Sequence, residues 1–208
     1  MDTQLMSPML LITLALAALT GCGGGKPLKA EDRASITTVS VAKAVKIPDE
    51  PLMVGSEAGL SILFGAAGGA GAAAAESSNA KSFAEYLHAS GIDIGEIVRG
   101  QFTEQLNASA FYGPRLSPDG PYRFVLEVKV YGINKTNTFS SQWVPNLRLD
   151  YQLLSPGGKV IAEDWAMVPP FSDLPTFTVE EMKANPQVLK NAFDQAAASL
   201  SAKLVPKE

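Results

Sequence analysis

Residues 122–133 read YRFVLEVKVYGI, and their alternation of side-chain character decides the fold class. Aromatic or aliphatic side chains occupy every second position, at Tyr122, Phe124, Leu126, Val128 and Val130. Residues 147–153 alternate in the same way, and a period of two is typical of strands with one buried face. Between residues 154 and 159, Ser155-Pro156-Gly157-Gly158 places Pro and Gly at the second and third positions of a type II turn. The three segments 122–133, 147–153 and 159–168 therefore predict antiparallel strands, with a hairpin at residues 155–158.

Helical patterns lie on both sides of these strands. Apolar residues recur at helical spacing in residues 78–90, 94–106 and 189–204. Three helix starts carry capping residues, namely Asp93 with Glu96, Thr178 with Glu181, and Asn185 before Pro186. Residues 35–46 are rich in β-branched side chains and predict a first strand. The order predicts a single α+β domain over residues 35–208, with a small antiparallel sheet and amphipathic helices packed on one face.

Composition excludes several classes of function. The chain has 208 residues, 46% of them hydrophobic and 18% charged, and a net charge of −4. This balance does not supply the clustered basic surface that nucleic acids require. A single His and a single Cys exclude the usual zinc ligand sets and an internal disulfide. The sequence therefore predicts no metal, no cofactor, no catalytic residues and no nucleic-acid partner.

The first residues carry a targeting signal. Residues 9–19, MLLITLALAAL, form an uncharged core too short to span a bilayer, and Leu19-Thr20-Gly21-Cys22 follows it. This arrangement resembles the lipobox of bacterial lipoproteins, although the leader carries Asp2 and no Lys or Arg before its core. The resemblance implies that residues 1–21 are a signal peptide and that signal peptidase II cleaves before Cys22. It also implies that Cys22 carries the lipid, including palmitate, as the new N-terminus.

The residues after the lipobox predict how the domain is held. Residues 22–34 begin with three glycines after the cysteine and predict a lipid-anchored flexible tether. In lipoproteins an Asp after the lipidated Cys favours inner-membrane retention, so Gly23 implies the outer membrane, facing the periplasm. The order of elements also resembles that of small α+β envelope lipoproteins, such as the penicillin-binding-protein activators and curli secretion-channel lipoproteins.

A Gly/Ala-rich insertion at residues 55–77 interrupts the domain. Within it, residues 58–75 hold no charge, but only Leu60, Ile62, Leu63 and Phe64 are large and apolar. Because Gly and Ala contribute little to membrane insertion, we favour a connector. A segment that contacts the membrane or self-associates is the second interpretation, and a transmembrane helix is the third.

Other candidate residues favour structural roles. His88 has no neighbouring nucleophile in the sequence, and Glu163 and Asp164 point to opposite faces of a strand. Glu180 and Glu181 favour solvated charge. Four aromatic residues near proline-rich loops form either a binding platform or, as we favour, one end of the core: Trp143, Trp165, Phe171 and Phe177.

Three functions remain in competition at this point. The favoured one is a non-enzymatic, membrane-anchored envelope lipoprotein that binds a protein or another envelope component. The alternative is a subunit of an envelope pore or of a secretion or transport complex, with the Gly/Ala-rich segment at the membrane. An anchored hydrolase is the least favoured, because the sequence lacks a nucleophile–base constellation. The oligomeric state is left open.

Overall fold

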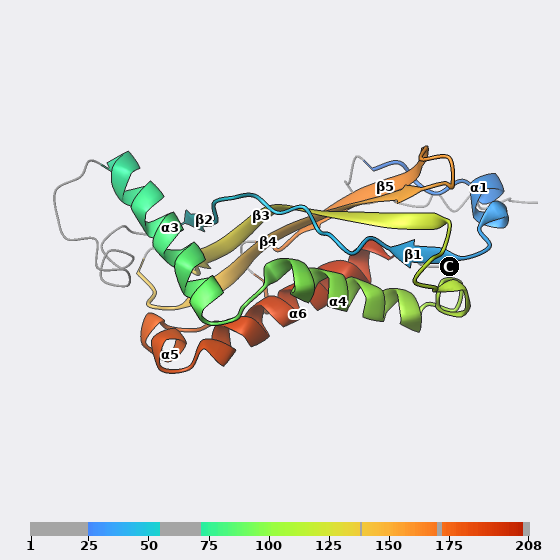
Figure 1. Ribbon diagram of the computed structural model, residues 1–208. Helices are drawn as coiled ribbons and strands as arrows, with labels where there is room; N and C mark the ends of the chain where they lie inside the picture. Colours follow the sequence, from blue (N-terminus) through green and yellow to red (C-terminus); the bar gives the residue numbers. More distant parts are fainter. Residues whose placement is uncertain (1–24, 55–71, 138, 170–171, 206–208) are drawn as a thin grey trace, which may run out of the picture.

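The computed structural model describes residues 25–54, 72–137, 139–169 and 172–205, which form an α+β domain (Figure 1). Five strands make one mixed sheet with the order β1-β3-β4-β5. Strand β2 also pairs with β3, further along the same strand than β1. The strands are β1 (Val39–Val41), β2 (Leu52–Val54), β3 (Tyr122–Lys135), β4 (Trp143–Leu154) and β5 (Val160–Met167). The long antiparallel hairpin of β3 and β4 forms the centre of the sheet.

The predicted fold class is confirmed, but the sheet is not wholly antiparallel. Strands β3, β4 and β5 are antiparallel neighbours, whereas β1 and β2 both run parallel to β3 along its outer edge. A parallel pair needs a long crossover connection, which α3 and α4 supply here. The strand predicted over residues 35–46 is reduced to β1 and an isolated bridge between Lys46 and Glu127.

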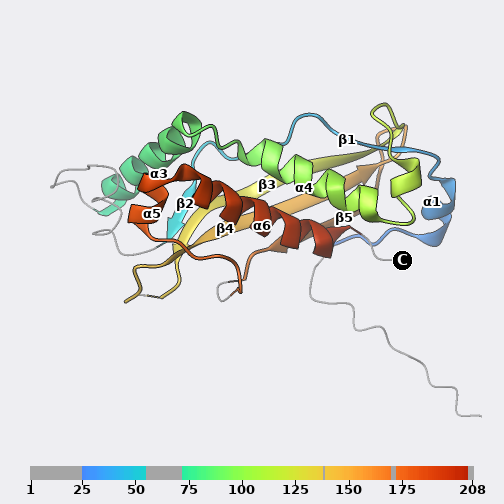
Figure 2. The same cartoon turned by 90° about the horizontal axis from the view of Figure 1, so that it is seen from below.

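The helices cover one face of the sheet. Figures 1 and 2 show α4 and α6 side by side beneath the β3–β4 hairpin, with α3 at the end that carries β2 and α1 at the opposite end. The α-helices are α1 (Ala30–Ser35), α3 (Ala72–Ala89), α4 (Ile94–Ala108), α5 (Val179–Ala184) and α6 (Pro186–Leu204), and a 3₁₀ turn, η1, spans Gly113–Arg115.

The predicted helix starts are confirmed by side-chain caps. The Asp93 carboxylate accepts a hydrogen bond from the Glu96 amide, and Asn185 caps α6 in front of Pro186. Thr178 and Glu181 form a complete capping box at α5. At the end of α3, Gly91 takes a φ of +66°, the left-handed conformation that a glycine adopts at little cost.

An aromatic cluster joins the helices to the sheet. The Phe102 ring on α4 lies 5.4 Å from Phe124 on β3 and 5.9 Å from Tyr151 on β4, measured between ring centroids. Tyr112 lies 5.4 Å from Phe124 in an edge-to-face arrangement. All four rings are buried. Contacts of this geometry add about 0.5–1.5 kcal/mol each beyond the burial of area, so the cluster fixes α4 on the hairpin.

The prediction of a type II turn between β4 and β5 is wrong. The Gly158 amide donates to the Ser155 carbonyl at 2.8 Å, as in any hydrogen-bonded β-turn. However, the positive φ of +79° belongs to Gly158 and not to Gly157. The loop is therefore a type I turn followed by a left-handed glycine, a combination whose twist matches that of the flanking strands.

Several sequence predictions lie outside the described residues. These are the signal peptide at residues 1–21, the lipidation site Cys22, and the Gly/Ala-rich stretch as far as residue 71. The last residues of that stretch, Ala72–Ala75, form the first turn of α3. Among the helices of the described ranges, none has the length and apolar character needed to cross a membrane. The later part of the tether predicted over residues 22–34 lies in regular structure, because Lys26 pairs with β5 and α1 begins at Ala30.

Candidate functional site on the open face of the sheet

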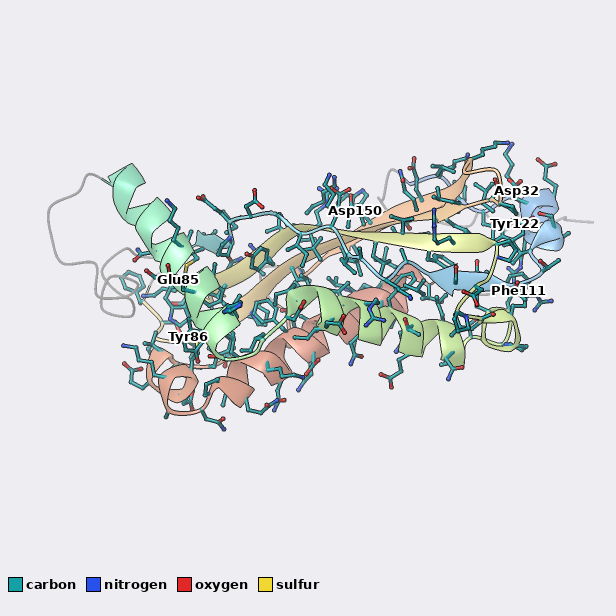
Figure 3. All side chains as sticks on the ribbon, viewed as in Figure 1. Asp32, Glu85, Tyr86, Phe111, Tyr122 and Asp150 are labelled. Atoms are coloured by element: carbon teal, nitrogen blue, oxygen red, sulfur yellow. The ribbon has the colours of Figure 1, made fainter. Side chains whose placement is uncertain are left out.

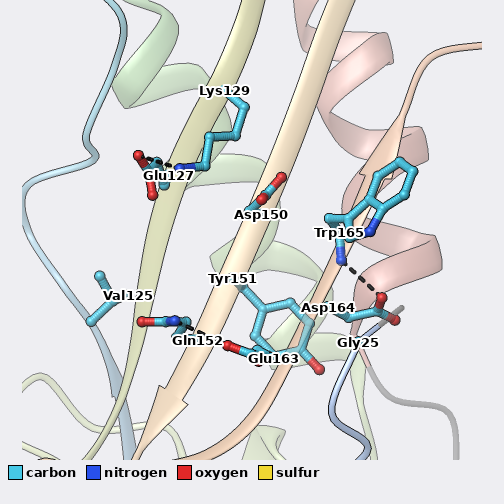
Figure 4. Close-up of a pocket in the computed structure, with 10 residues that line it drawn as sticks. All are labelled: Gly25, Val125, Glu127, Lys129, Asp150, Tyr151, Gln152, Glu163, Asp164 and Trp165. Atoms are coloured by element: carbon cyan, nitrogen blue, oxygen red, sulfur yellow. Dashed lines mark hydrogen bonds and ion pairs between the residues drawn. The ribbon is translucent and has the colours of Figure 1, made fainter. Parts of the chain in front are cut away.

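The face of the sheet that α4 and α6 leave uncovered carries a hollow of about 260 Å³ (Figure 4). Figure 3 shows Asp150, one of its residues, on the side of the sheet away from these helices. Strand register places two rows of side chains across the hollow. The rows are Glu127–Asp150–Trp165 and Val125–Gln152–Glu163, each drawn from β3, β4 and β5 in turn.

Two lysines neutralise the carboxylate at the β3 side of the hollow. The Lys129 ammonium lies 2.7 Å from Oε1 of Glu127, and the Lys46 ammonium lies 3.0 Å from the same oxygen. Hydrogen bonds from Lys129 and then from Lys46 hold the pKa of Glu127 below its usual value. Glu127 is therefore ionised at neutral pH and is a poor proton donor.

An arginine connects the remaining charged and aromatic groups. Nε and Nη2 of Arg148 donate to the two carboxylate oxygens of Asp150, at 2.9 and 3.2 Å. The same guanidinium lies 4.3 Å from the centroid of the Trp165 ring. This two-point pairing fixes the plane of the guanidinium, which then covers one side of the indole. Trp165 still exposes 36% of its surface.

The first described residues of the chain close one side of the hollow. The Glu163 amide donates to the Lys26 carbonyl at 2.9 Å, and the Lys26 ammonium donates to the Val160 carbonyl at 2.5 Å. A Cβ at Gly25 would lie 2.5 Å from the Glu163 carbonyl oxygen and 2.7 Å from a carboxylate oxygen of Asp164. Only a glycine allows the chain this close to β5, which is otherwise the edge strand of the sheet.

The arrangement favours binding over proton transfer. Each carboxylate of the two rows has a partner, since Glu163 accepts a hydrogen bond from Gln152 at 3.0 Å. The surface presents amide, guanidinium and indole groups that contact a ligand by hydrogen bonding and stacking. In the described part of the chain, no group of three or more His, Cys, Asp or Glu residues is placed to hold a metal ion.

The residues weighed as sites from sequence are dispersed over the fold. His88 is exposed on α3, beside a groove that Asp93 and Tyr131 also line. The Glu181 carboxylate accepts a hydrogen bond from the amide of Thr178, the N-cap of α5. The register places Glu163 opposite Gln152 and Asp164 opposite Tyr151, so the two carboxylates of β5 occupy opposite faces.

The four aromatic residues near the proline-rich loops do not form one platform. Trp143 and Phe177 are buried and paired by backbone hydrogen bonds, as expected for aromatics that close one end of the core. Trp165 lies instead on the open face of the sheet, and Phe171 lies outside the described residues.

The hollow itself was not predicted from sequence. The polar positions that alternate with the apolar ones in β3 and β4 mark a face turned to solvent. The alternation alone therefore predicts that Glu127, Asp150 and Gln152 lie on that face. The approach of Gly25 and Lys26 to β5 carries no local signal, because it depends on contact between segments far apart in the chain.

The chain was compared with protein families, curated sequences and solved structures. The chain matches no protein-family model and no curated protein sequence. Among solved structures, the chain is similar to a dodecamer of a PelC variant from Paraburkholderia phytofirmans, with 14% sequence identity. The alignment covers 87% of this chain and 92% of that chain, with a TM-score of 0.38.

Proposed function

We propose that this protein is a non-enzymatic lipoprotein of the bacterial cell envelope, anchored by a lipid on Cys22, and that its open sheet face binds a component of the envelope. The observation that carries this proposal is the attachment of Lys26 to β5, four residues after the cysteine. A lipidated N-terminus at Cys22 brings this face next to the membrane, since each residue spans at most about 3.8 Å.

The chemistry of the open face supports a binding role. The carboxylate of Glu127 is held ionised by two ammonium groups, and Asp150 is engaged by Arg148. General acid–base catalysis requires a group whose pKa lies near the working pH, and the two lysines hold the pKa of Glu127 below its usual value instead. Paired charges beside an exposed indole are typical of a surface that recognises a partner by shape and hydrogen bonding.

Lipid attachment is tested with the full chain expressed in bacterial cells. Labelled palmitate should enter the parent protein and the Gly23→Ala control, and the Cys22→Ala variant should carry no label. Mass analysis of the N-terminal peptide should show that the mature chain starts at Cys22. A labelled Cys22→Ala variant, or an unlabelled parent, contradicts the proposal.

The outer membrane is the proposed location, and the residue after Cys22 tests it. The Gly23→Asp variant introduces the residue that favours inner-membrane retention in lipoproteins. After separation of the two membranes, the parent and Gly23→Ala should be found with the outer membrane and Gly23→Asp with the inner one. A parent found with the inner membrane contradicts this location.

A further inference from the structure

The start of the described chain limits how far the domain can stand from its anchor. Gly25 lines the hollow together with Glu163 and Trp165. Only two residues separate Gly25 from Cys22, so their Cα atoms are at most about 11 Å apart, at 3.8 Å for each step. The headgroup layer on each side of a bilayer is about 5–8 Å thick. A lipid on Cys22 therefore keeps the β5 side of the hollow within the headgroup layer or close to its outer surface.

Residues on the same edge have the character of a membrane-contacting surface. Trp165 and Met167 are adjacent on the open face of β5, with 36% and 44% of their surfaces exposed. Trp is enriched where membrane meets water, because its ring is apolar and its N–H is polar. Arg148, stacked on Trp165, adds a guanidinium that hydrogen-bonds phosphates.

The charges around this edge do not oppose contact with phospholipid. The basic side chains on the open face around the hollow equal the acidic ones in number: Lys46, Lys129 and Arg148 against Glu127, Asp150 and Glu163. Because this set has no net charge, neither zwitterionic nor anionic headgroups meet a repulsive field.

From this geometry, and resting on the lipid anchor proposed above, we infer that Trp165, Met167 and Arg148 form a membrane-contacting edge that binds the phospholipid headgroup layer. Strand β5 then faces the bilayer, and the helical layer of α4 and α6 faces away from it. The component of the envelope that the open face binds is accordingly the surface of the membrane that carries the anchor.

The test uses the mature chain from Cys22 and does not depend on lipidation in cells. The Cys22 thiol, the sole thiol of the chain, is coupled to a maleimide lipid in phosphatidylcholine vesicles. Part of the phosphatidylcholine is brominated near the glycerol end of its acyl chains, because bromine quenches indole fluorescence only on contact. Subtracting the emission of a Trp165→Phe variant isolates Trp165 from Trp143, which is buried.

A matched control moves the reporter to the other layer. Glu104 is exposed on α4, so a Trp165→Phe/Glu104→Trp double variant carries an indole on the helical side. Brominated vesicles should quench Trp165 in the parent and leave the reporter at position 104 unquenched. Replacing Met167 with Glu should weaken the quenching of Trp165, because a charge at this place disfavours contact with acyl chains.

Three results would overturn the inference. In the first, Trp165 of the parent protein coupled to the vesicles is quenched by aqueous iodide and not by brominated lipid. In the second, brominated lipid quenches the indoles at positions 165 and 104 equally. The third is a Trp165 that neither iodide nor bromine quenches, which would mean that a second copy of the chain covers β5. None of these results bears on palmitate labelling in cells, so failure of the membrane-contacting edge is distinguishable from failure of the anchor.

Discussion

The attachment of the N-terminal segment to β5 depends on Gly25 having no side chain. In a Gly25→Val variant, the new Cβ would lie 2.5 Å from the Glu163 carbonyl oxygen and 2.7 Å from an Asp164 carboxylate oxygen. Cβ atoms do not approach backbone oxygen so closely, so the segment must move off the strand. The move breaks the hydrogen bond from the Glu163 amide to the Lys26 carbonyl, and it releases the Lys26 ammonium from Val160.

The size of the effect follows from these two hydrogen bonds. A neutral hydrogen bond contributes about 0.5–1.5 kcal/mol and one from a charged group about 1.5–3 kcal/mol, so undocking should lower the local free energy of opening by about 2 kcal/mol or more. A change of 2 kcal/mol corresponds to about a 30-fold change in an equilibrium constant. Protection of the Glu163 amide against hydrogen exchange should fall by about this factor, while amides in the centre of β4 keep theirs.

Gly157 supplies the matched control, because no atom lies within 4 Å of its ideal Cβ position and its φ is not positive. A Gly157→Val variant should therefore leave the exchange of the Glu163 amide unchanged. If Gly25→Val and Gly157→Val both exchange like the parent at Glu163, the close packing of Gly25 against β5 does not hold the segment. The tether would then be free up to α1, as the sequence predicted.

Two further predictions concern the domain itself. Gly100→Ala should raise the free energy of unfolding by about 1 kcal/mol, because position 100 of α4 is open and Ala favours a helix. Thermal unfolding measures this change. Gly95→Ala should raise the free energy of unfolding by less, because its Cβ would lie 3.1 Å from Ile47. Alkaline pH should destabilise the fold, since burial raises the pKa of Tyr112 to about 12 and also raises that of Tyr151. Between about pH 10 and 12 the unfolded chain has then lost protons that the folded chain keeps, so the free energy of unfolding falls as pH rises. Urea unfolding at several alkaline pH values measures this slope, which Tyr112→Phe should reduce; an unchanged slope contradicts the assignment.

Much of the fold follows from local patterns in the sequence. The alternation in residues 122–133 and 147–153 locates β3 and β4, although each strand extends beyond the predicted segment. Side chains within one helical turn determine where α4, α5 and α6 begin, so Asp93, Thr178 and Asn185 mark those starts. Such signals are readable because the interacting groups are at most a few residues apart.

The turn at residues 155–158 shows where local reasoning stops. Pro156-Gly157 fits a type II turn by residue preference, yet the left-handed residue is Gly158. The twist of β4 and β5 selects the turn that joins them, and that twist belongs to the paired strands rather than to the four residues. Likewise β2, with three residues, is too short for a periodic pattern and exists through its pairing with residues 132–134 of β3.

The sequence by itself determined the α+β class, the central hairpin, the helix starts and the lipobox resemblance at Cys22, because each depends on neighbouring residues. Only the tertiary structure decided that β1 and β2 lie parallel to β3, that Arg148 covers Trp165, and that Lys26 is fixed to β5. These contacts join residues on different elements, and strand register sets which side chains meet. The open face exists for the same reason, since α4 and α6 cover the other side of the sheet.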